Sequence, residues 1–139
     1  MINAVLHAEI TQRVHRLWRG VERFEYADVI SLLSPTCRWN RAGRWRDGHA
    51  EILASLEERP RDRLVRHLIG SLAVDSEGAE LVCRYTLSSV HNGAAPEAAA
   101  PFSTIGQRLL GDCTDRLVQI NGTWLFENLD AELLFLAKG

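Results

Sequence analysis

The chain has 139 residues, of which 46% are hydrophobic and 24% charged, and its net charge is −2. This composition is that of an ordinary globular protein and gives no reason to expect nucleic acid or an anionic membrane surface as a partner. No apolar run approaches the ~20 residues of a membrane-spanning helix. The three cysteines lack paired spacing and the N-terminus does not resemble a signal peptide, so we expect reduced thiols and a cytoplasmic location.

The first part of the chain carries the pattern of helices. Apolar residues from Leu6 onward recur at steps of three and four, which predicts a long helix over residues 3–19 that Gly20 could end. A second, shorter helix is expected over residues 26–33, and Pro35 is expected to stop it.

The remainder of the chain changes from helical to strand-like patterns. Two short strands are predicted around the turn at Ala42, and Asp47 is placed to cap a third helix. The turn sequences that follow are hairpin signals, so the later strands should be antiparallel. Helices first and a strand meander second predict an α+β fold, with helices on one face of a curved sheet. The four later strand-like runs are residues 64–74, 79–91, 103–120 and 123–130.

Two histidines lie on apolar rows of adjacent predicted strands. His67 alternates with Val65, Ile69 and Ser71, and His91 lies on the row that includes Tyr85. A lone histidine on such a row is more often a core residue with a backbone partner. Two of them on paired strands could instead converge on one apolar pocket, which is the usual form of a small-molecule site.

Other chemical motifs are absent from the sequence. His7, His15 and His49 are expected at the surface, and no histidine set has zinc-site spacing, so no metal site is predicted. There is no glycine-rich phosphate loop and no G-x-S-x-G elbow. Cys113 shares a strand face with Asp115 and has no basic neighbour in sequence, which is typical of a buried, inert thiol.

Three segments resemble the NTF2-like superfamily, in particular SnoaL-like and scytalone dehydratase-like proteins. They are "SPTCRW", where the second helix leads into the first strand, "RHLIGSLAVDSEGAELVCRYTLSSVH", which holds both histidines, and the final hairpin "INGTWLFENLDAEL". The resemblance implies a cystatin-like cone that spans residues 1–139 as a single domain.

The same resemblance implies a set of site residues. His67 matches the histidine that a carboxylate holds, His91 matches the second histidine, and Glu22 stands near the position of the family's aspartate. The family's substrate-binding tyrosine is matched by Arg41, and its asparagine by Cys113, or by Asp112 or Asp115 if the strand register differs. The relatives work by acid–base chemistry without metal or organic cofactor, so the resemblance implies a lyase or isomerase of the dehydratase type.

The expected partner is a small hydrophobic or cyclic organic molecule. If Arg41 points into the pocket, it favours an anionic or enolate-bearing substrate; if it points outward, it is a solvated strand residue. The candidate substrate-binding residues are Trp39, Arg41, Tyr85, Cys113 and Asp115.

Two rival functions remain open. One is a non-catalytic ligand-binding or accessory module, similar to the β subunits of ring-hydroxylating dioxygenases. The other is a polyketide-type cyclase, which predicts an inward-facing Asp115 or Asp112 as the main acid. Members of this fold often dimerise through the outer sheet face, so a homodimer or higher homo-oligomer is expected. That face is predicted to include Val82, Val90, Leu110 and Val118.

Overall fold

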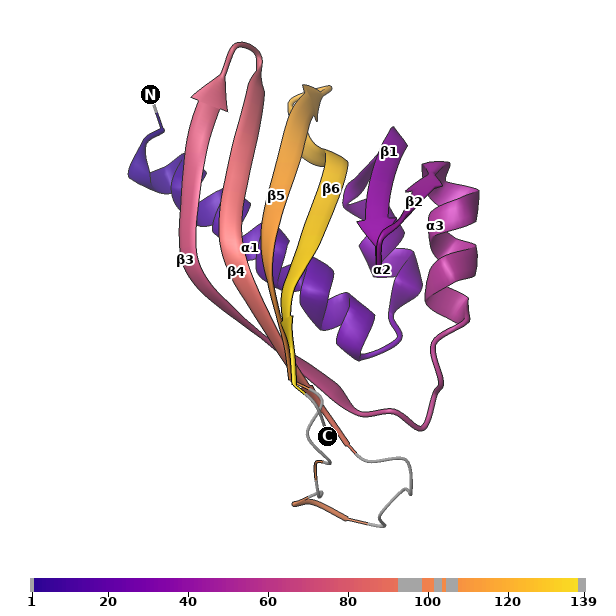
Figure 1. The fold of residues 1–139 in the computed structure, drawn as a ribbon. Helices are drawn as coiled ribbons and strands as arrows, with labels where there is room; N and C mark the ends of the chain where they lie inside the picture. Colours follow the sequence, from indigo (N-terminus) through magenta and orange to yellow (C-terminus); the bar gives the residue numbers. More distant parts are fainter. Residues whose placement is uncertain (1, 93–98, 102–103, 105–107, 138–139) are drawn as a thin grey trace.

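The computed structural model describes residues 2–92, 99–101, 104 and 108–137 (Figure 1). Three helices occupy the first part of the chain and long strands the second. In chain order the elements are α1 (Ala4–Glu22), α2 (Tyr26–Ser31), β1 (Leu33–Arg41), β2 (Arg44–Asp47), α3 (Gly48–Glu57), β3 (Val65–Glu77), β4 (Glu80–His91), β5 (Arg108–Ile120) and β6 (Thr123–Leu136).

All six strands join in one mixed sheet. Its order is β2-β1-β6-β5-β4-β3, in which β1 and β6 are parallel and every other neighbouring pair is antiparallel. The sheet is strongly curved, and α1 runs across one of its faces (Figure 1). The predicted α+β class, with helices packed on a curved sheet, is therefore confirmed.

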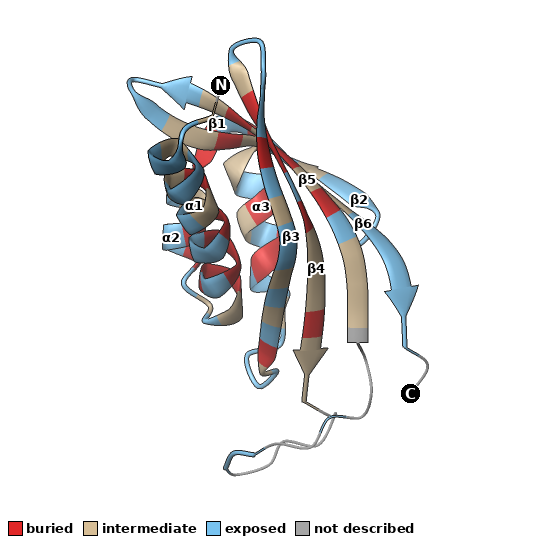
Figure 2. Ribbon diagram, turned by 90° about the vertical axis from the view of Figure 1, so that its left-hand side faces the viewer, coloured by how far each residue is buried: buried red, intermediate tan, exposed pale blue. Residues whose placement is uncertain are grey.

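Helix α1 supplies much of the core. Asn3 caps it, because its Oδ1 accepts a hydrogen bond from the Leu6 backbone N–H at 2.8 Å. Figure 2 shows buried positions on the side of the helices that faces the sheet. The helix runs on to Glu22, so the predicted end at Gly20 is wrong. A Cβ at Gly20 would lie 2.7 Å from Val29 Cγ2, so this glycine permits close packing of α2.

The second helix ends earlier than its apolar pattern predicts. It stops at Ser31, and Pro35 lies inside β1 instead of ending the helix. The Phe126 N–H of β6 donates to Leu32 O at 2.9 Å, which draws this segment into the sheet. The β1–β6 register shifts just after Leu33, in the part of the strand where proline has no N–H to donate to the ladder.

Strand β3 contains an irregularity at Ser71 that we did not predict from the sequence. Ser71 has a positive φ of 52°, and the β3–β4 register shifts between Gly70 and Ala73. The alternation of side chains is therefore interrupted after Ile69. Ser71 is exposed, and the prediction that it shares an inward face with His67 is wrong.

The outer sheet face differs from the predicted apolar surface at one position. Val82 is fully buried, and its cross-strand neighbours Asp75 and Arg116 belong to a cluster of ion pairs with Glu77 and Arg84. The other residues predicted for this face, Val90, Leu110 and Val118, are half-buried. A homo-oligomer through this face stays a prediction.

The three cysteines, Cys37, Cys83 and Cys113, are buried and form no disulfide. Burial raises the pKa of the Cys37 and Cys83 thiols to about 12, and the charge of Asp115 acts in the same direction on both. These thiols are therefore protonated and unreactive near neutral pH. Within the described part of the chain, no helix is long and apolar enough to cross a membrane.

Candidate functional site

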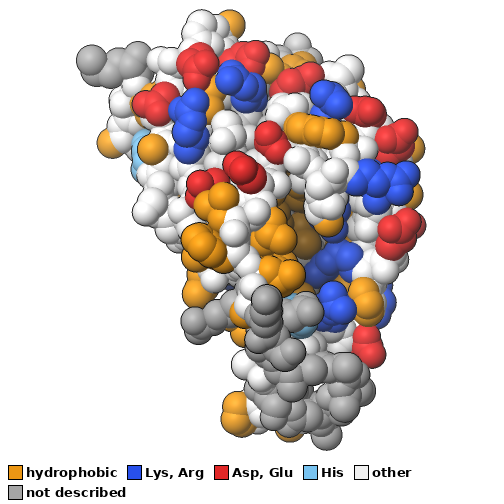
Figure 3. Space-filling model, in the orientation of Figure 1, with side chains coloured by type: hydrophobic (Ala, Val, Ile, Leu, Met, Phe, Trp, Pro, Cys, Tyr) orange, Lys and Arg blue, Asp and Glu red, His pale blue; other side chains and the backbone are white. Residues whose placement is uncertain are grey.

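A cavity of about 660 Å³ lies between the helices and the inner face of the sheet. This volume falls within the range of small-molecule sites. Figure 3 shows a hollow on the surface of the molecule with apolar side chains and Lys or Arg side chains beside it. The lining residues are Trp18, Val21, Trp39, Asn40, Arg41, Ala42, Gly43, Arg59, Pro60, Arg63, Val65, His67, Leu87, Ser89, His91, Leu109, Gly111, Cys113, Ala131, Glu132 and Leu133.

One wall of the cavity holds a histidine paired with a carboxylate. Glu22 is the last residue of α1, and its Oε2 lies 3.0 Å from Nδ1 of His67, the third residue of β3. The same oxygen accepts a hydrogen bond from the His67 backbone N–H. The two side chains are only 11% and 10% exposed, so water competes little for this pair.

The surroundings of Glu22 keep its carboxylate ionised. Burial raises the pKa of Glu22, but the hydrogen bonds from the His67 ring and backbone, with the charges of His67 and Arg66, outweigh burial and lower it. An ionised carboxylate can only accept hydrogen bonds, so Nδ1 of His67 must carry the proton that it donates to Glu22. In the neutral ring, Nε2 then carries the lone pair. His67 lines the cavity, and Nε2 is the ring nitrogen that the bond to Glu22 leaves available.

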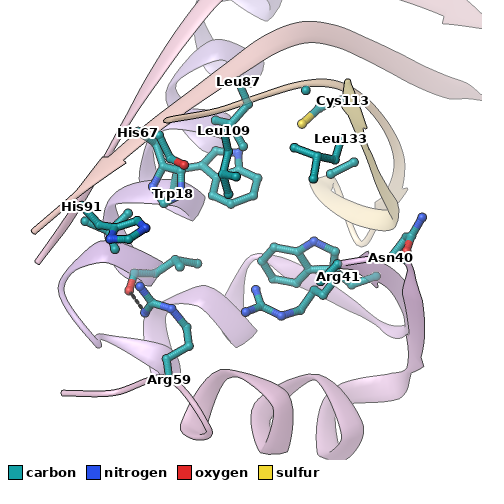
Figure 4. Close-up of a pocket in the computed structure, with 18 of the residues that line it drawn as sticks. Trp18, Asn40, Arg41, Arg59, His67, Leu87, His91, Leu109, Cys113 and Leu133 are labelled. Carbon is teal, nitrogen blue, oxygen red and sulfur yellow. Dashed lines mark hydrogen bonds between the residues drawn. The ribbon is translucent and has the colours of Figure 1, made fainter. Parts of the chain in front are cut away.

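His91 lies on the wall of the same cavity. Its strand pairs with β3 so that His91 stands opposite Val65, and His67 stands opposite Ser89. Figure 4 shows the His67 and His91 rings on the same side of the pocket. The Nδ1 of His91 lies 2.9 Å from the Asn92 carbonyl oxygen, a backbone partner typical of a structural histidine. His67 differs, because its ring partner is a carboxylate.

Behind His67 a chain of buried polar groups leads away from the cavity. The Trp18 ring lies against the His67 ring, with centroids 4.8 Å apart. Trp18 Nε1 donates to the Tyr85 hydroxyl at 2.8 Å, and Tyr85 donates to Asp115 Oδ2 at 2.6 Å. The direction is fixed because an indole N–H can only donate. Trp18 is therefore held in place by Tyr85 and Asp115.

Asp115 has an unusual environment for a carboxyl group. It is 2% exposed, and burial raises its pKa to about 8, although the hydrogen bond from Tyr85 acts in the opposite direction. Burial and the nearby Asp115 also raise the pKa of Tyr85. Asp115 is inward-facing, but it does not line the cavity; Tyr85 and Trp18 connect it to the region of His67. Its position fits a role in orienting Trp18.

The remaining predicted residues divide between the cavity and its surroundings. Trp39, Arg41 and Cys113 line the cavity, whereas Tyr85 and Asp115 lie behind its wall. Burial raises the pKa of the Cys113 thiol well above its usual range, as do the charges of neighbouring aspartates. This thiol therefore offers the cavity an apolar, uncharged surface.

Most of the lining residues were not predicted as site residues from sequence, and two of them, Trp18 and Arg59, bear directly on the chemistry of the site. Trp18 belongs to the apolar stripe of α1, and its place one turn before Glu22 was the available signal, because residues four apart share a helix face. Arg59 comes from the polar segment after α3, which reads as solvated; nothing local indicates that it turns toward a cavity. His49, expected at the surface, is half-buried and its Nε2 lies 2.8 Å from Ser34 O.

A metal centre does not emerge from the residues that the structure describes. Among them, no group of three or more His, Cys, Asp and Glu side chains is arranged to hold a metal ion. The groups that the cavity presents include imidazole, carboxylate and guanidinium.

Several solved structures are similar to this chain. Aln2 from a Streptomyces species superposes with a TM-score of 0.80 at 14% identity, covering 96% of this chain and 93% of that chain. A putative scytalone dehydratase from Novosphingobium aromaticivorans superposes with a TM-score of 0.77 at 14% identity, covering 95% of this chain and 86% of that chain. A type 2 hexachlorocyclohexane dehydrochlorinase (LinA) superposes with a TM-score of 0.76 at 13% identity, covering 96% of this chain and 88% of that chain. At these identities the likeness shows the fold alone.

Sequence comparison gives the family. No curated protein sequence matches the chain. The family model described as SnoaL-like domain matches residues 4–130, which is most of the chain and includes the helices, both histidines and the first part of the final hairpin. Together with the curled sheet and its cystatin-like neighbours, this match shows that the chain belongs to the SnoaL-like domain family, with an NTF2-like fold.

Proposed function

We propose that this protein is an enzyme, a lyase or isomerase of the dehydratase type, which acts by acid–base chemistry on a small cyclic, partly apolar substrate. The observation that carries the proposal is the Glu22–His67 pair at 3.0 Å on the wall of a large cavity. A buried carboxylate that holds one histidine tautomer is the usual way to prepare an imidazole as a general base. The putative dehydratase and the dehydrochlorinase among the structural neighbours bear names of elimination reactions, which supports the choice of class.

In the proposed reaction, Nε2 of His67 removes a proton from the carbon next to a carbonyl group. The electron pair of the C–H bond forms the enolate, and the C–O bond of a β-hydroxyl group then breaks to give the conjugated enone. The leaving hydroxide takes one proton and departs as water. That proton comes from the His67 imidazolium or from His91, so the reaction needs no oxidant or reductant. Ionised Glu22 stabilises the imidazolium between the two steps.

The two rival functions are less well supported by the geometry. A non-catalytic module would favour a histidine satisfied by backbone groups and remote from any cavity, whereas His67 pairs with a carboxylate and lines one. A cyclase that uses Asp115 as its main acid needs that carboxyl group to reach the substrate. Asp115 lies behind Tyr85 and does not line the cavity. Asp112, the other acid considered for a cyclase, is exposed and does not line the cavity either.

Turnover of a panel of β-hydroxy cyclic ketones, followed by absorbance of the enone product, tests this proposal. The His67→Ala variant should lose roughly 10²–10⁴-fold in kcat/KM, the usual contribution of a positioned general base. Glu22→Gln should lose less, because the ring remains but its imidazolium is no longer stabilised by a charge.

A matched control is His15→Ala, which removes an exposed histidine from α1 and should leave turnover unchanged. Unchanged turnover in His67→Ala on a substrate that the unmodified protein converts would remove the base assignment.

A further inference from the structure

Two arginines reach into the cavity opposite the histidines. Arg41 ends β1, and Arg59 follows α3. Both line the cavity, and Figure 4 shows their side chains in the same lower part of it, with His67, Trp18 and His91 above. The sequence left open whether Arg41 points inward; the structure places it on the cavity wall.

Arg59 is held in a fixed position. Its Nη1 donates to the Val21 carbonyl oxygen and, at 2.9 Å, to the Tyr26 hydroxyl. Its guanidinium also lies over the Phe24 ring, 5.1 Å from the ring centroid. These contacts use one nitrogen and one face of the group, so the charge is anchored but not neutralised.

The charge of Arg41 is offset by even fewer contacts than that of Arg59. Its guanidinium lies 5.0 Å from the centroid of the Trp39 ring, and none of the ion pairs formed by the described residues includes Arg41 or Arg59. Burial lowers the pKa of Arg41 to about 10, and the like charge of Arg59 acts in the same direction. Two cations held near each other in a cavity are costly unless an anion joins them.

We infer that Arg41 and Arg59 together bind an anionic group of the substrate, a carboxylate, and that the substrate is therefore a cyclic or aromatic acid. Guanidinium groups match the planar geometry of a carboxylate and bind it with charge-assisted hydrogen bonds. The apolar roof of Leu87 and Leu109 then covers the ring of the substrate, and the carboxylate on the floor directs the far part of the ring toward His67. This inference rests on the proposed function for the role of His67, but not for the anion site itself.

Binding of naphthoate and of its neutral isostere naphthamide tests the inference. Titrations followed by tryptophan fluorescence, at about pH 8.5 so that imidazoles carry little charge, give the two affinities. Naphthoate should bind about 10- to 100-fold more tightly than naphthamide, the ratio expected of hydrogen bonds to a charged group. Arg41→Gln should reduce the affinity for naphthoate by about tenfold or more and leave that for naphthamide unchanged, which also shows that the variant is folded.

The control for charge alone is Arg44→Gln, which removes an exposed arginine from the same hairpin outside the cavity and should preserve the ratio. Equal affinities for the two probes in the unmodified protein, the absence of saturable naphthoate binding, or an equal loss of both affinities in Arg41→Gln would overturn the inference.

The result is separable from the acid–base proposal. His67→Ala should keep the preference for naphthoate, because it leaves both arginines in place. If His67 were not the base, turnover would survive in that variant while the naphthoate preference held. If the arginines did not bind anions, the preference would be missing while the loss of turnover in His67→Ala remained.

Discussion

At the residue scale, Asp115 is a buried carboxyl group that helps to position Trp18. Its carboxyl group accepts from Tyr85, which accepts from Trp18, whose ring packs on His67. A protonated and an ionised carboxyl group can both accept this bond, so the chain of contacts survives either state. The protonated form is favoured by burial, which makes Asp115 a group whose titration is linked to folding.

This linkage predicts how stability depends on pH. The folded-state pKa of Asp115 is raised from 3.8 to about 8, so between these values the folded protein holds a proton that the unfolded chain has released. The free energy of unfolding should therefore fall as pH rises from about 4 to about 8. Asp115→Asn, measured by denaturant unfolding across that range, should show a flatter profile.

The matched control is Asp112→Asn, which changes an exposed aspartate on the same strand. It should retain the slope of the unmodified protein. Because one pKa unit corresponds to about 1.4 kcal/mol, the divergence of the two variants should be readily measurable. Parallel stability profiles for Asp115→Asn and Asp112→Asn would contradict the linkage.

At the element scale, the approach of β5 to β6 shapes the far wall of the cavity. The register shifts between Leu110 and Gly111, where Gly111 pairs with Leu133 and Leu110 with Phe135. Both members of the first pair line the cavity. A Cβ at Gly111 would lie only 2.6 Å from the Glu132 carbonyl oxygen, a backbone atom that cannot rotate away. The absence of a side chain here lets the two strands pack closely.

Gly111→Ala should therefore destabilise the protein, by about 1–3 kcal/mol, the usual cost of an inserted methyl group in a packed interior. Gly70→Ala is the control, because it is another strand glycine but its Cβ would meet nothing within 4 Å. That variant should be neutral or slightly more stable, since alanine restricts the unfolded chain. Chemical denaturation measures both changes, and equal effects at the two positions would refute the close-approach argument.

Local sequence patterns predicted some of the helices and strands correctly and others wrongly. The period of α1 and the Asn-Gly turn after β5 are local signals, and both gave the correct element. Pro35 shows where such signals fail, because the parallel pairing of Leu33 with Phe126 outweighs a helical pattern that continues to that point. The irregularity at Ser71 was also not predicted, although Gly70 beside it is a residue type that often marks such a shift within a strand.

At the scale of the whole molecule, the order of helices before strands was enough to predict the α+β class. The paired histidines could be named because they occur within one recognisable segment, and Glu22 because it stands near the position of the family's aspartate. The arginine pair could not, because Arg59 reaches the cavity only through its contacts with Val21 and Tyr26, which are distant in sequence. Tertiary packing thus supplied the part of the candidate site that no short motif encodes.

The end of β6 carries four consecutive exposed apolar side chains. Leu133, Leu134, Phe135 and Leu136 are each between 43% and 66% exposed. Leu133 contributes to the cavity wall, so this segment belongs partly to the site. A second copy of the chain on the outer face remains the expectation from sequence, and its test is the oligomeric state in solution.

The central claim is that His67, held by Glu22, acts as a base inside the cavity. Exchange of the α-protons of α-tetralone for deuterium in D₂O, followed by proton NMR, measures this act without requiring the natural substrate or an anionic group. The unmodified protein should accelerate exchange over buffer, and His67→Ala should reduce that acceleration by roughly 10²–10⁴-fold. Equal exchange rates for the unmodified protein and His67→Ala, or no acceleration over buffer, would contradict the claim.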